Sequence, residues 1–209
     1  MNYYQEITLI EQADVGLNYV HSAVYEGIHT ALCDNYQGLK VNIGVSFPLY
    51  EYAEKADKGQ LGNKMRLFAK TKQELALLDI PAVLDTYADY IHITSIKEVG
   101  SKATHYEVYS RYRHRGHYKK AKRLQAHLIK KYGSEWFDEN LGSYDAVLAN
   151  CIAHSPMLNP PFIALKSHTN GQEYHVQFSR EKLKQPTESF SFNGYGLSSK
   201  KNPSAVPAW

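Results

Sequence analysis

The chain has 209 residues, of which 43% are hydrophobic and 22% charged, and its formal net charge at pH 7 is +3. This length allows one domain or two small ones, and a mean hydropathy of −0.49 without a long apolar run argues against a membrane-spanning helix. The first residues lack the pattern of a secretory signal, so we expect a cytoplasmic protein whose two cysteines, Cys33 and Cys151, are buried thiols rather than part of a disulfide or zinc framework.

Hydrophobic patterns in the first half of the chain predict strands and helices in the order βαββαβ. The predicted elements are a strand over Tyr3–Ile10, a helix over Leu17–Leu32, strands over Leu39–Phe47 and Met65–Ala69, a helix over Lys72–Leu78 and a strand over Tyr90–Ile96. An acidic, glycine-containing loop is expected over 51–63. This order is that of the ferredoxin-like unit, a common scaffold of RNA-binding proteins. We therefore predict an α+β protein whose residues 1–98 form a ferredoxin-like domain.

A stretch with glycine and serine, 98–104, is predicted to separate this domain from a second α+β domain over residues 105–209. In the second domain we expect a basic helix, then a short helix over Tyr144–Ala153, and then the chain breaker Asn159-Pro160-Pro161. Three further strands are predicted over Phe162–Ser167, Glu173–Phe178 and Phe190–Tyr195.

Positive charge is concentrated between Val108 and Ser134, where nine lysines and arginines stand without an acidic residue. They are Arg111, Arg113, Arg115, Lys119, Lys120, Lys122, Arg123, Lys130 and Lys131. Taking these nine from the 24 Lys and Arg leaves 15 against 21 Asp and Glu, so the rest of the chain carries −6 while this segment carries +9. A cationic stripe on an otherwise acidic protein is typical of a polyanion site, and nucleic acid is the commonest polyanion.

From Tyr118 onward the segment has the periodicity of an amphipathic helix that ends at Gly133. One side collects the apolar residues Tyr118, Ala121, Leu124, Leu128, Ile129 and Tyr132. The other side collects the predicted RNA contacts Lys119, Lys120, Arg123, His127, Lys130 and Lys131. The alternative is an ordinary solvated helix, but such a helix normally carries Glu or Asp four residues from its lysines, so we favour nucleic-acid binding.

Five sequence blocks follow one another along nearly the whole chain. They are Gly-Ile-His-Thr-Ala-Leu at 27–32, Asn-Ile-Gly-Val-Ser-Phe-Pro at 42–48, Ser110-Arg111, Leu-Lys-Ser-His-Thr-Asn-Gly-Gln at 165–172 and Gly-Tyr-Gly-Leu-Ser at 194–198. In these blocks the chain resembles the type I-F CRISPR-associated repeat endoribonuclease of the Csy type. The resemblance implies a ferredoxin-like domain followed by a domain with an arginine-rich helix, which we expect Ser110-Arg111 to open.

The resemblance also implies a function. An enzyme of this kind binds the repeat hairpin of pre-crRNA, cleaves at the 3′ base of the stem by attack of a 2′-hydroxyl, and retains the crRNA hairpin. It uses neither a metal ion nor another cofactor, and its products end in a 2′,3′-cyclic phosphate or 3′-phosphate and a 5′-hydroxyl. The implied partners are the pre-crRNA or crRNA hairpin and the other subunits of a type I-F surveillance complex, without a membrane, and the free protein is a monomer.

Cleavage of this kind requires a group that transfers protons, and histidine suits this task because its charge changes near neutral pH. By the resemblance, His29 is the catalytic histidine, Ser167 holds the attacking 2′-hydroxyl, and Tyr195 orients the histidine or the scissile region. Helical periodicity agrees for His29, which points away from the apolar stripe of Leu17, Val20, Ala23, Val24, Ile28 and Ala31. Alternative or second proton-transfer groups are His168, His175 and His154.

The resemblance assigns further RNA contacts. Arg111 matches an arginine that reads a guanine near the base of the stem, and Arg113 stands where the family has a glutamine, with Arg115 in the same basic run. Thr169 stands at the place of a serine, and Tyr174 at the place of a phenylalanine that stacks on a base. Alternatively, Arg111 and Arg113 contact only phosphates, Ser167 and Thr169 are turn residues before Asn170-Gly171, and Tyr174 and Tyr195 are core aromatics.

Other chemistry is disfavoured by the sequence. Lysines surround His114, His117 and His127 and repel a metal cation, so we predict no metal site. Phosphate-binding, dinucleotide-binding and hydrolase nucleophile motifs do not occur. Two other classes of function stay open, namely a non-cleaving subunit that binds the crRNA hairpin in a type I-F effector complex, and a general protein that binds structured RNA.

Overall fold

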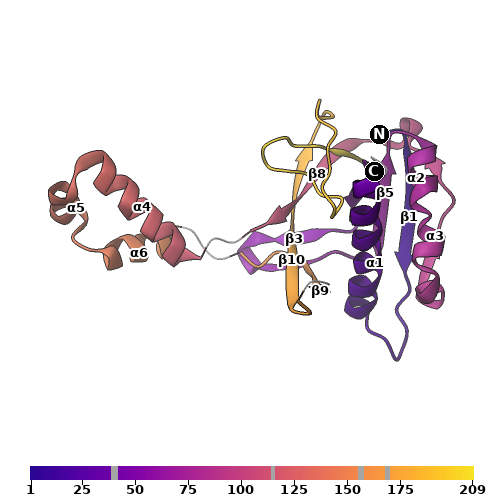
Figure 1. Ribbon diagram of the computed structural model, residues 1–209, viewed down its shortest axis with the longest axis horizontal. Coiled ribbons are helices and arrows are strands. Elements are labelled where there is room, and N and C mark those ends of the chain that lie inside the picture. Colours follow the sequence, from indigo (N-terminus) through magenta and orange to yellow (C-terminus); the bar gives the residue numbers. More distant parts are fainter. Residues whose placement is uncertain (39–41, 114–115, 155–157, 168–169) are drawn as a thin grey trace. The chain divides into compact units, whose positions relative to one another are not determined.

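The computed structural model describes residues 1–38, 42–113, 116–154, 158–167 and 170–209, and the fold is mixed α+β (Figure 1). Contacts divide the chain into two compact units, one comprising Met1–Tyr112 with Pro160–Trp209 and the other Arg113–Asn159. The sequence instead predicts a boundary at 98–104. Strand pairing explains the difference, because residues 105–112 form a strand of the first unit.

The first unit contains an antiparallel sheet with the strand order β2-β5-β1-β6. Its main elements are β1 (Tyr3–Leu9), α1 (Leu17–Gly38), β2 (Gly44–Ser46), β5 (Lys64–Ala69), α2 (Lys72–Leu78) and β6 (Ile91–Ile93). Strand β1 lies between β5 and β6, so Ile7 stands opposite both Met65 and Ile93. These six elements occur in the predicted order of strands and helices.

Smaller elements add to this pattern. They are β3 (Glu51–Ala53), β4 (Lys58–Gln60), the 3-10 helices η1 (Glu54–Ala56), η2 (Asp85–Tyr90) and η3 (Gly100–Lys102), the short helix α3 (Ile80–Val83) and β7 (Lys97–Glu98). The β3–β4 hairpin occupies much of the expected loop at 51–63. The strand predicted over Tyr90–Ile96 is confirmed only for the three residues of β6, because η2 takes up the chain as far as Tyr90.

Helix α2 has the predicted bounds because its first turn is capped. The N–H of Glu74 donates to Oγ1 of Thr71 at 3.2 Å, and the N–H of Thr71 donates to Oε2 of Glu74 at 2.9 Å. This reciprocal pair satisfies two backbone donors that the helix leaves without internal partners. The helix ends at Asp79, which has a left-handed φ of 45°.

A second antiparallel sheet in the same unit has the order β11-β8-β10-β9. Its strands are β8 (His105–Tyr112), β9 (Phe162–Lys166), β10 (Glu173–Leu183) and β11 (Val206–Ala208). One face of this sheet shares the core of the first sheet, where Leu165 and Phe178 are buried together with Phe47. The hydroxyl of Tyr109 lies 2.8 Å from the carbonyl oxygen of Phe47, and burial raises the pKa of this tyrosine. The two sheets therefore form one body.

Two predictions for this region are wrong. Arg111, expected at the start of the basic helix, lies in β8 opposite Phe178 of β10. The aromatic residues of 105–112 favour a strand, and pairing with a partner some 70 residues away stabilises it. The strand predicted over Phe190–Tyr195 is absent, since only Phe192 in that range forms an isolated bridge, with Ser198.

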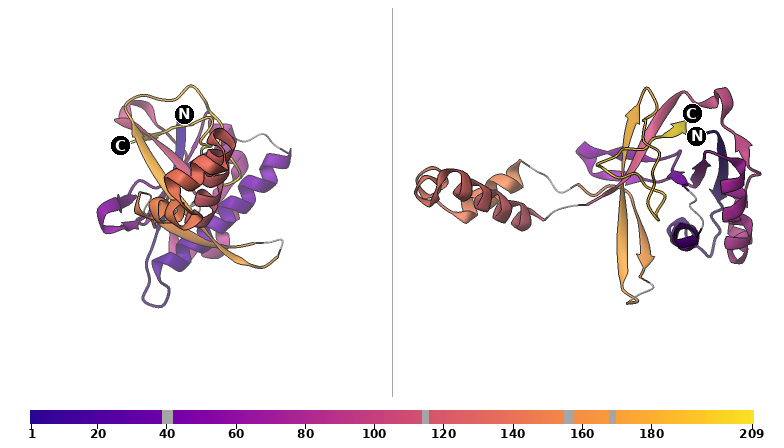
Figure 2. Two further views of the ribbon diagram at one scale, coloured as in Figure 1. Left: turned by 90° about the vertical axis from the view of Figure 1, so that its left-hand side faces the viewer. Right: turned by 45° about the horizontal axis from the view of Figure 1, so that its top comes forward.

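The second unit contains α4 (His117–Tyr132), α5 (Ser134–Leu141) and α6 (Tyr144–Ala153) (Figure 2). Its small core comprises Ala121, Phe137, Val147 and Cys151. The expected buried thiol of Cys151 is confirmed, whereas Cys33 in the first unit is only partly buried. In the described part of the chain, no helix combines the length and hydropathy that crossing a membrane requires.

Candidate active site

An open pocket of about 510 Å³ in the first unit is lined by side chains from well-separated parts of the chain. They are His29 of α1, Arg111 of β8, Lys166 and Ser167 at the end of β9, Asn170, Gln172, Glu173 and Tyr174 of the following turn and β10, and Tyr195 of the C-terminal segment. The pocket thus brings together all three residues predicted to be catalytic and two of the predicted RNA contacts, Arg111 and Tyr174.

A backbone carbonyl holds the imidazole of His29. Its Nδ1 lies 2.7 Å from the carbonyl oxygen of Gly194. Because a carbonyl oxygen can only accept, Nδ1–H is the donor, and the neutral ring then carries its lone pair on Nε2. Ile28, the preceding residue of α1, is fully buried, whereas His29 is half-buried and reaches the pocket. Nε2 is therefore the atom that can accept a proton from a substrate.

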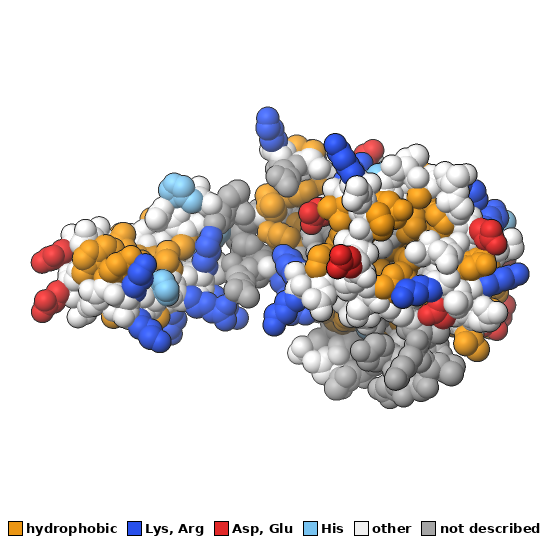
Figure 3. All heavy atoms as spheres, turned by 90° about the horizontal axis from the view of Figure 1, so that it is seen from above, with side chains coloured by type: hydrophobic (Ala, Val, Ile, Leu, Met, Phe, Trp, Pro, Cys, Tyr) orange, Lys and Arg blue, Asp and Glu red, His pale blue; other side chains and the backbone are white. Residues whose placement is uncertain are grey.

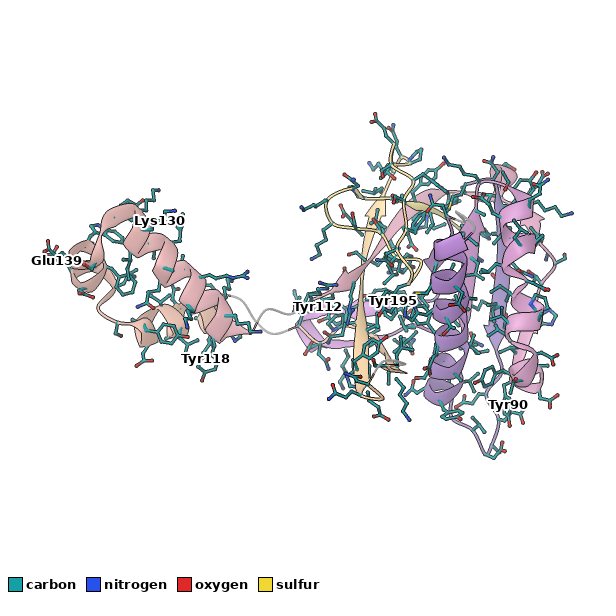
Figure 4. The ribbon with its side chains drawn as sticks, viewed as in Figure 1. Tyr90, Tyr112, Tyr118, Lys130, Glu139 and Tyr195 are labelled. Carbon is teal, nitrogen blue, oxygen red and sulfur yellow. The ribbon has the colours of Figure 1, made fainter. Side chains whose placement is uncertain are left out.

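The ring of Tyr195 stacks on His29. The two ring centroids are 3.9 Å apart and the ring planes differ by 8°. Two contacts hold the backbone of Tyr195, since its carbonyl accepts from the buried hydroxyl of Tyr25 at 2.9 Å and its N–H donates to Oδ1 of Asn193 at 2.9 Å. Figure 4 labels Tyr195 beside α1. The stack fixes the plane of the imidazole and presents an aromatic face to it when it is protonated.

Two glycines allow this arrangement. A Cβ at Gly194 would lie 2.7 Å from Sγ of Cys33, and a Cβ at Gly196 would lie 2.3 Å from Cγ2 of Val45. Gly196 also has a φ of +67°, which residues other than glycine rarely adopt. The tight turn that carries Tyr195 therefore depends on glycine at both flanking positions.

Tyr174 and Arg111 continue the cluster around Tyr195. The hydroxyls of Tyr174 and Tyr195 are 3.1 Å apart, and the guanidinium carbon of Arg111 lies 5.8 Å and 5.6 Å from the two ring centroids. Burial, followed by the hydrogen bond with Tyr195, raises the pKa of Tyr174 to about 12. Tyr174 therefore stays protonated near neutral pH. Both tyrosines also pack against the core. They are therefore core aromatics, which was the alternative expected from the sequence, and line the pocket as well.

Ser167 opens the turn between β9 and β10. Its N–H donates to the carbonyl of Gln172 at 2.9 Å, and its own carbonyl accepts from the N–H of Gly171 at 2.8 Å. Gly171 has a left-handed φ of +68°, as the Asn170-Gly171 signal predicts. Ser167 is thus a turn residue and a residue of the pocket at once. Thr169 and His168 lie outside the described residues.

Cys33 also belongs to this cluster, although the sequence patterns predict only a buried thiol there. Its Sγ lies 3.5 Å from Nδ1 of His29 and 3.9 Å from the carbonyl oxygen of Gly194. Burial, together with the nearby charge of Asp34, raises the pKa of this thiol. Helical spacing is the signal that could have revealed it, because residues 29 and 33 are neighbours one turn apart on α1.

The other predicted RNA contacts that the structure describes belong to the second unit. The exposed residues of α4 include Lys119, Lys120, Arg123, His127, Lys130 and Lys131, and Arg113 before the helix is exposed as well. Figure 3 shows lysine and arginine side chains gathered on the helical unit. On the predicted apolar side, Ala121 is buried, but Tyr118 is 71% and Tyr132 is 47% exposed. Arg115 and His114 lie outside the described residues.

Two other histidines considered for proton transfer are described, and neither of them lines the pocket. His175 is exposed in β10 and stacks on Phe162, and His154 ends α6 in the second unit. Among the residues that the structure describes, no group of three or more His, Cys, Asp and Glu side chains could hold a metal ion. His29 is thus the histidine that the described pocket contains.

The family model described as "CRISPR-associated protein (Cas_Csy4)" matches residues 4–209. No curated protein sequence matches the chain.

Proposed function

The chain belongs to the Cas_Csy4 family, the type I-F CRISPR repeat endoribonucleases, and we propose that it cleaves pre-crRNA at the 3′ base of the repeat hairpin and retains the hairpin. Membership of this family implies CRISPR-associated RNA processing and binding of CRISPR repeat RNA. The observation that carries the finer proposal is the pocket in which His29, Ser167 and Tyr195, from distant parts of the chain, lie together.

His29 is the proton-transfer group in the proposed reaction. Its Nε2 accepts the proton of the 2′-hydroxyl beside the scissile phosphate, and the 2′ oxygen attacks phosphorus in line with the 5′ oxygen. A 2′,3′-cyclic phosphate forms, the bond from phosphorus to the 5′ oxygen breaks, and the 5′ oxygen takes up a proton from water, so the downstream RNA leaves with a 5′-hydroxyl. The hydrogen bond to Gly194 and the stack on Tyr195 support this role, because they fix the tautomer and the ring plane.

Three other residues of the pocket position the RNA. Ser167 holds the attacking 2′-hydroxyl, and Tyr174 stacks on a base at the end of the stem. Arg111 reads a guanine edge near the base of the stem. An A-form major groove is too narrow for such reading except near a helix end, where it opens. Their position around one pocket next to His29 supports this assignment.

Contacts to the phosphates of the stem come from the basic residues. We assign them to Lys119, Lys120, Arg123, His127, Lys130 and Lys131 of α4, with Arg113, Arg115 and Thr169 as further contacts. The exposure of the α4 residues and the absence of acidic residues from that helix support the assignment.

The proposal extends to the domains and the partners. Residues 1–98 form a ferredoxin-like domain that carries the catalytic histidine, and residues 105–209 supply the elements that bind RNA. The antiparallel sheet has the order β2-β5-β1-β6, and along the chain α1 lies between β1 and β2 and α2 between β5 and β6. This arrangement supports the ferredoxin-like assignment. The free protein is a cytoplasmic monomer that joins the other subunits of a type I-F complex.

A cleavage assay with a transcript of the repeat tests this function. Cleavage should persist in EDTA and stop when a 2′-deoxy nucleotide replaces the one upstream of the cut, while the hairpin still binds. Loss of cleavage in EDTA and its return with magnesium would show that the mechanism is wrong. Binding without cleavage would identify a scaffold subunit, and equal affinity for unrelated hairpins would identify a general RNA-binding protein.

A further inference from the structure

The second sheet carries an exposed aromatic pair on the face that points away from its core. In β9 and β10, which lie side by side (Figure 1), Ile163, Leu165 and Val176 are buried. Because side chains alternate along a strand, Phe162 and His175 point to the opposite face. Their ring centroids are 4.3 Å apart with planes inclined by 27°, and Phe162 is 45% exposed.

This pair has the chemistry of a surface that stacks bases. Single-stranded RNA is commonly bound on the open face of a sheet, where aromatic rings take unpaired bases between them or on top of them. The pair lies in the edge strand of the described sheet, because β9 is last in the order β11-β8-β10-β9. The exposed part of the Phe162 ring is therefore open to a base.

The face is continuous with the pocket. Lys166 and Ala164 share the outward face of β9 with Phe162, and Lys166 also lines the pocket that contains His29. At about 3.3 Å per residue, four steps along β9 place Phe162 about 13 Å from Lys166. RNA that leaves the base of a stem in the pocket can cover this distance within a few nucleotides.

Charge on this face favours contacts to bases over contacts to phosphates. Glu173 pairs directly with Lys166 in the sheet register, so a carboxylate stands beside the lysine. The two charges offset each other where a phosphate would lie. Stacking on Phe162 and His175 does not depend on these charges, because every base offers a π face.

We propose that Phe162 and His175 form a stacking platform for an unpaired nucleotide that flanks the repeat hairpin. The proposal rests on the proposed function, since it concerns the same RNA. It adds a third point of contact, beyond the stem and the pocket. The protein would then distinguish a hairpin within a longer transcript from an isolated hairpin.

Binding assays with two hairpins test the platform. One hairpin carries unpaired flanks and the other is blunt, and both carry a 2′-deoxy nucleotide upstream of the cut. The unaltered protein should bind the flanked hairpin more tightly, and Phe162→Ala should weaken that hairpin by at least about fivefold while leaving the blunt one unchanged. His175→Ala should have a smaller effect in the same direction, and Phe162→Tyr should keep the affinity because it keeps the ring.

Tyr19→Ala serves as the matched control, because Tyr19 is an exposed aromatic residue of α1 in the same unit. It should leave both affinities unchanged. Equal binding of flanked and blunt hairpins by the unaltered protein would overturn the platform. So would a Phe162→Ala protein that binds the flanked hairpin normally, or one that loses both hairpins equally.

A single-stranded RNA that has the sequence of the flank, contains no hairpin and carries 2-aminopurine separates the platform from the proposed function. Quenching by the unaltered protein but not by Phe162→Ala supports the platform, even if the hairpin is neither bound nor cleaved. Normal cleavage of the hairpin together with no quenching overturns the platform and leaves the proposed function intact.

Discussion

His29 and Tyr195 lie parallel, with ring centroids 3.9 Å apart, although 165 residues separate them in the chain. The carbonyl of Gly194, next to Tyr195, accepts the hydrogen bond from Nδ1 of His29. One short turn therefore determines both the plane of the imidazole and its tautomer. The geometry of the proposed base consequently depends on the C-terminal segment as much as on α1.

Replacing His29 with alanine should remove cleavage and leave binding nearly unchanged. A proton-transfer group contributes about 10² to 10⁴ in rate but little to ground-state affinity. Single-turnover cleavage and a gel-shift titration on the repeat hairpin measure the two quantities. His154→Ala is the control and should cleave normally. A His29→Ala protein that cuts at nearly the normal rate would direct attention to His168 or His175.

Replacing Gly194 with alanine should slow cleavage, because the new Cβ would lie 2.7 Å from Sγ of Cys33 and displace the carbonyl that holds His29. A second change, Cys33→Ala, removes the sulfur and should restore part of the rate. The double variant therefore tests the contact itself through single-turnover rates. If Gly194→Ala cleaves normally, the carbonyl does not position the histidine.

Stability should fall as the pH falls from about 6.5 to about 4. Burial lowers the pKa of His21 to about 4, and its Nε2 has no hydrogen-bond partner in the described part of the chain. Between these values the unfolded chain binds a proton that the folded chain does not, so the free energy of unfolding decreases on acidification, by up to about 3 kcal/mol.

Urea unfolding at pH 7.5 and pH 5 measures this effect. In a Trp136→Phe background the fluorescence of Trp209, which packs on Tyr4, reports the first unit. His21→Leu should flatten the pH dependence, whereas His92→Leu, on the exposed side of β6, should preserve it. An unchanged slope in His21→Leu would contradict the assignment.

Replacing a basic residue of α4 with alanine should weaken all hairpins alike. Lys119, Arg123 and Lys130 are exposed and belong to a helix without acidic residues, as suits contacts to phosphates. Each lost contact should reduce the slope of log affinity against log salt by roughly one unit. Titrations at several salt concentrations give this slope. An unchanged slope for all three variants would remove α4 from the RNA interface.

Replacing Arg111 with alanine should instead depend on the RNA sequence. If its guanidinium contacts a guanine edge through two hydrogen bonds, the change costs about 1 to 3 kcal/mol on the cognate hairpin. The cost should be much smaller on a hairpin with the matching base pair swapped. Equal losses on both hairpins, in the same binding assay, would make Arg111 a phosphate contact.

Features that depend on neighbouring residues could be predicted from the sequence alone. The hydrophobic pattern predicts a helix over Lys72–Leu78, where α2 lies, and helical periodicity predicts that Val24 and Ile28 face the core. The family resemblance, which the match over residues 4–209 confirms, also comes from the sequence. Such signals lie in neighbouring residues or in the order of short sequence blocks, and they do not depend on what the segment packs against.

Which distant segments of the chain meet could not be predicted and became visible with the fold. Arg111 lies in a strand because β10, about 70 residues away, supplies the hydrogen bonds of its backbone and a buried Phe178 opposite it. Cys33 and the carbonyl of Gly194 reach His29 because α1 and the C-terminal turn pack together. A backbone carbonyl has no signature in the sequence, and strand pairing depends on a partner that local patterns do not specify.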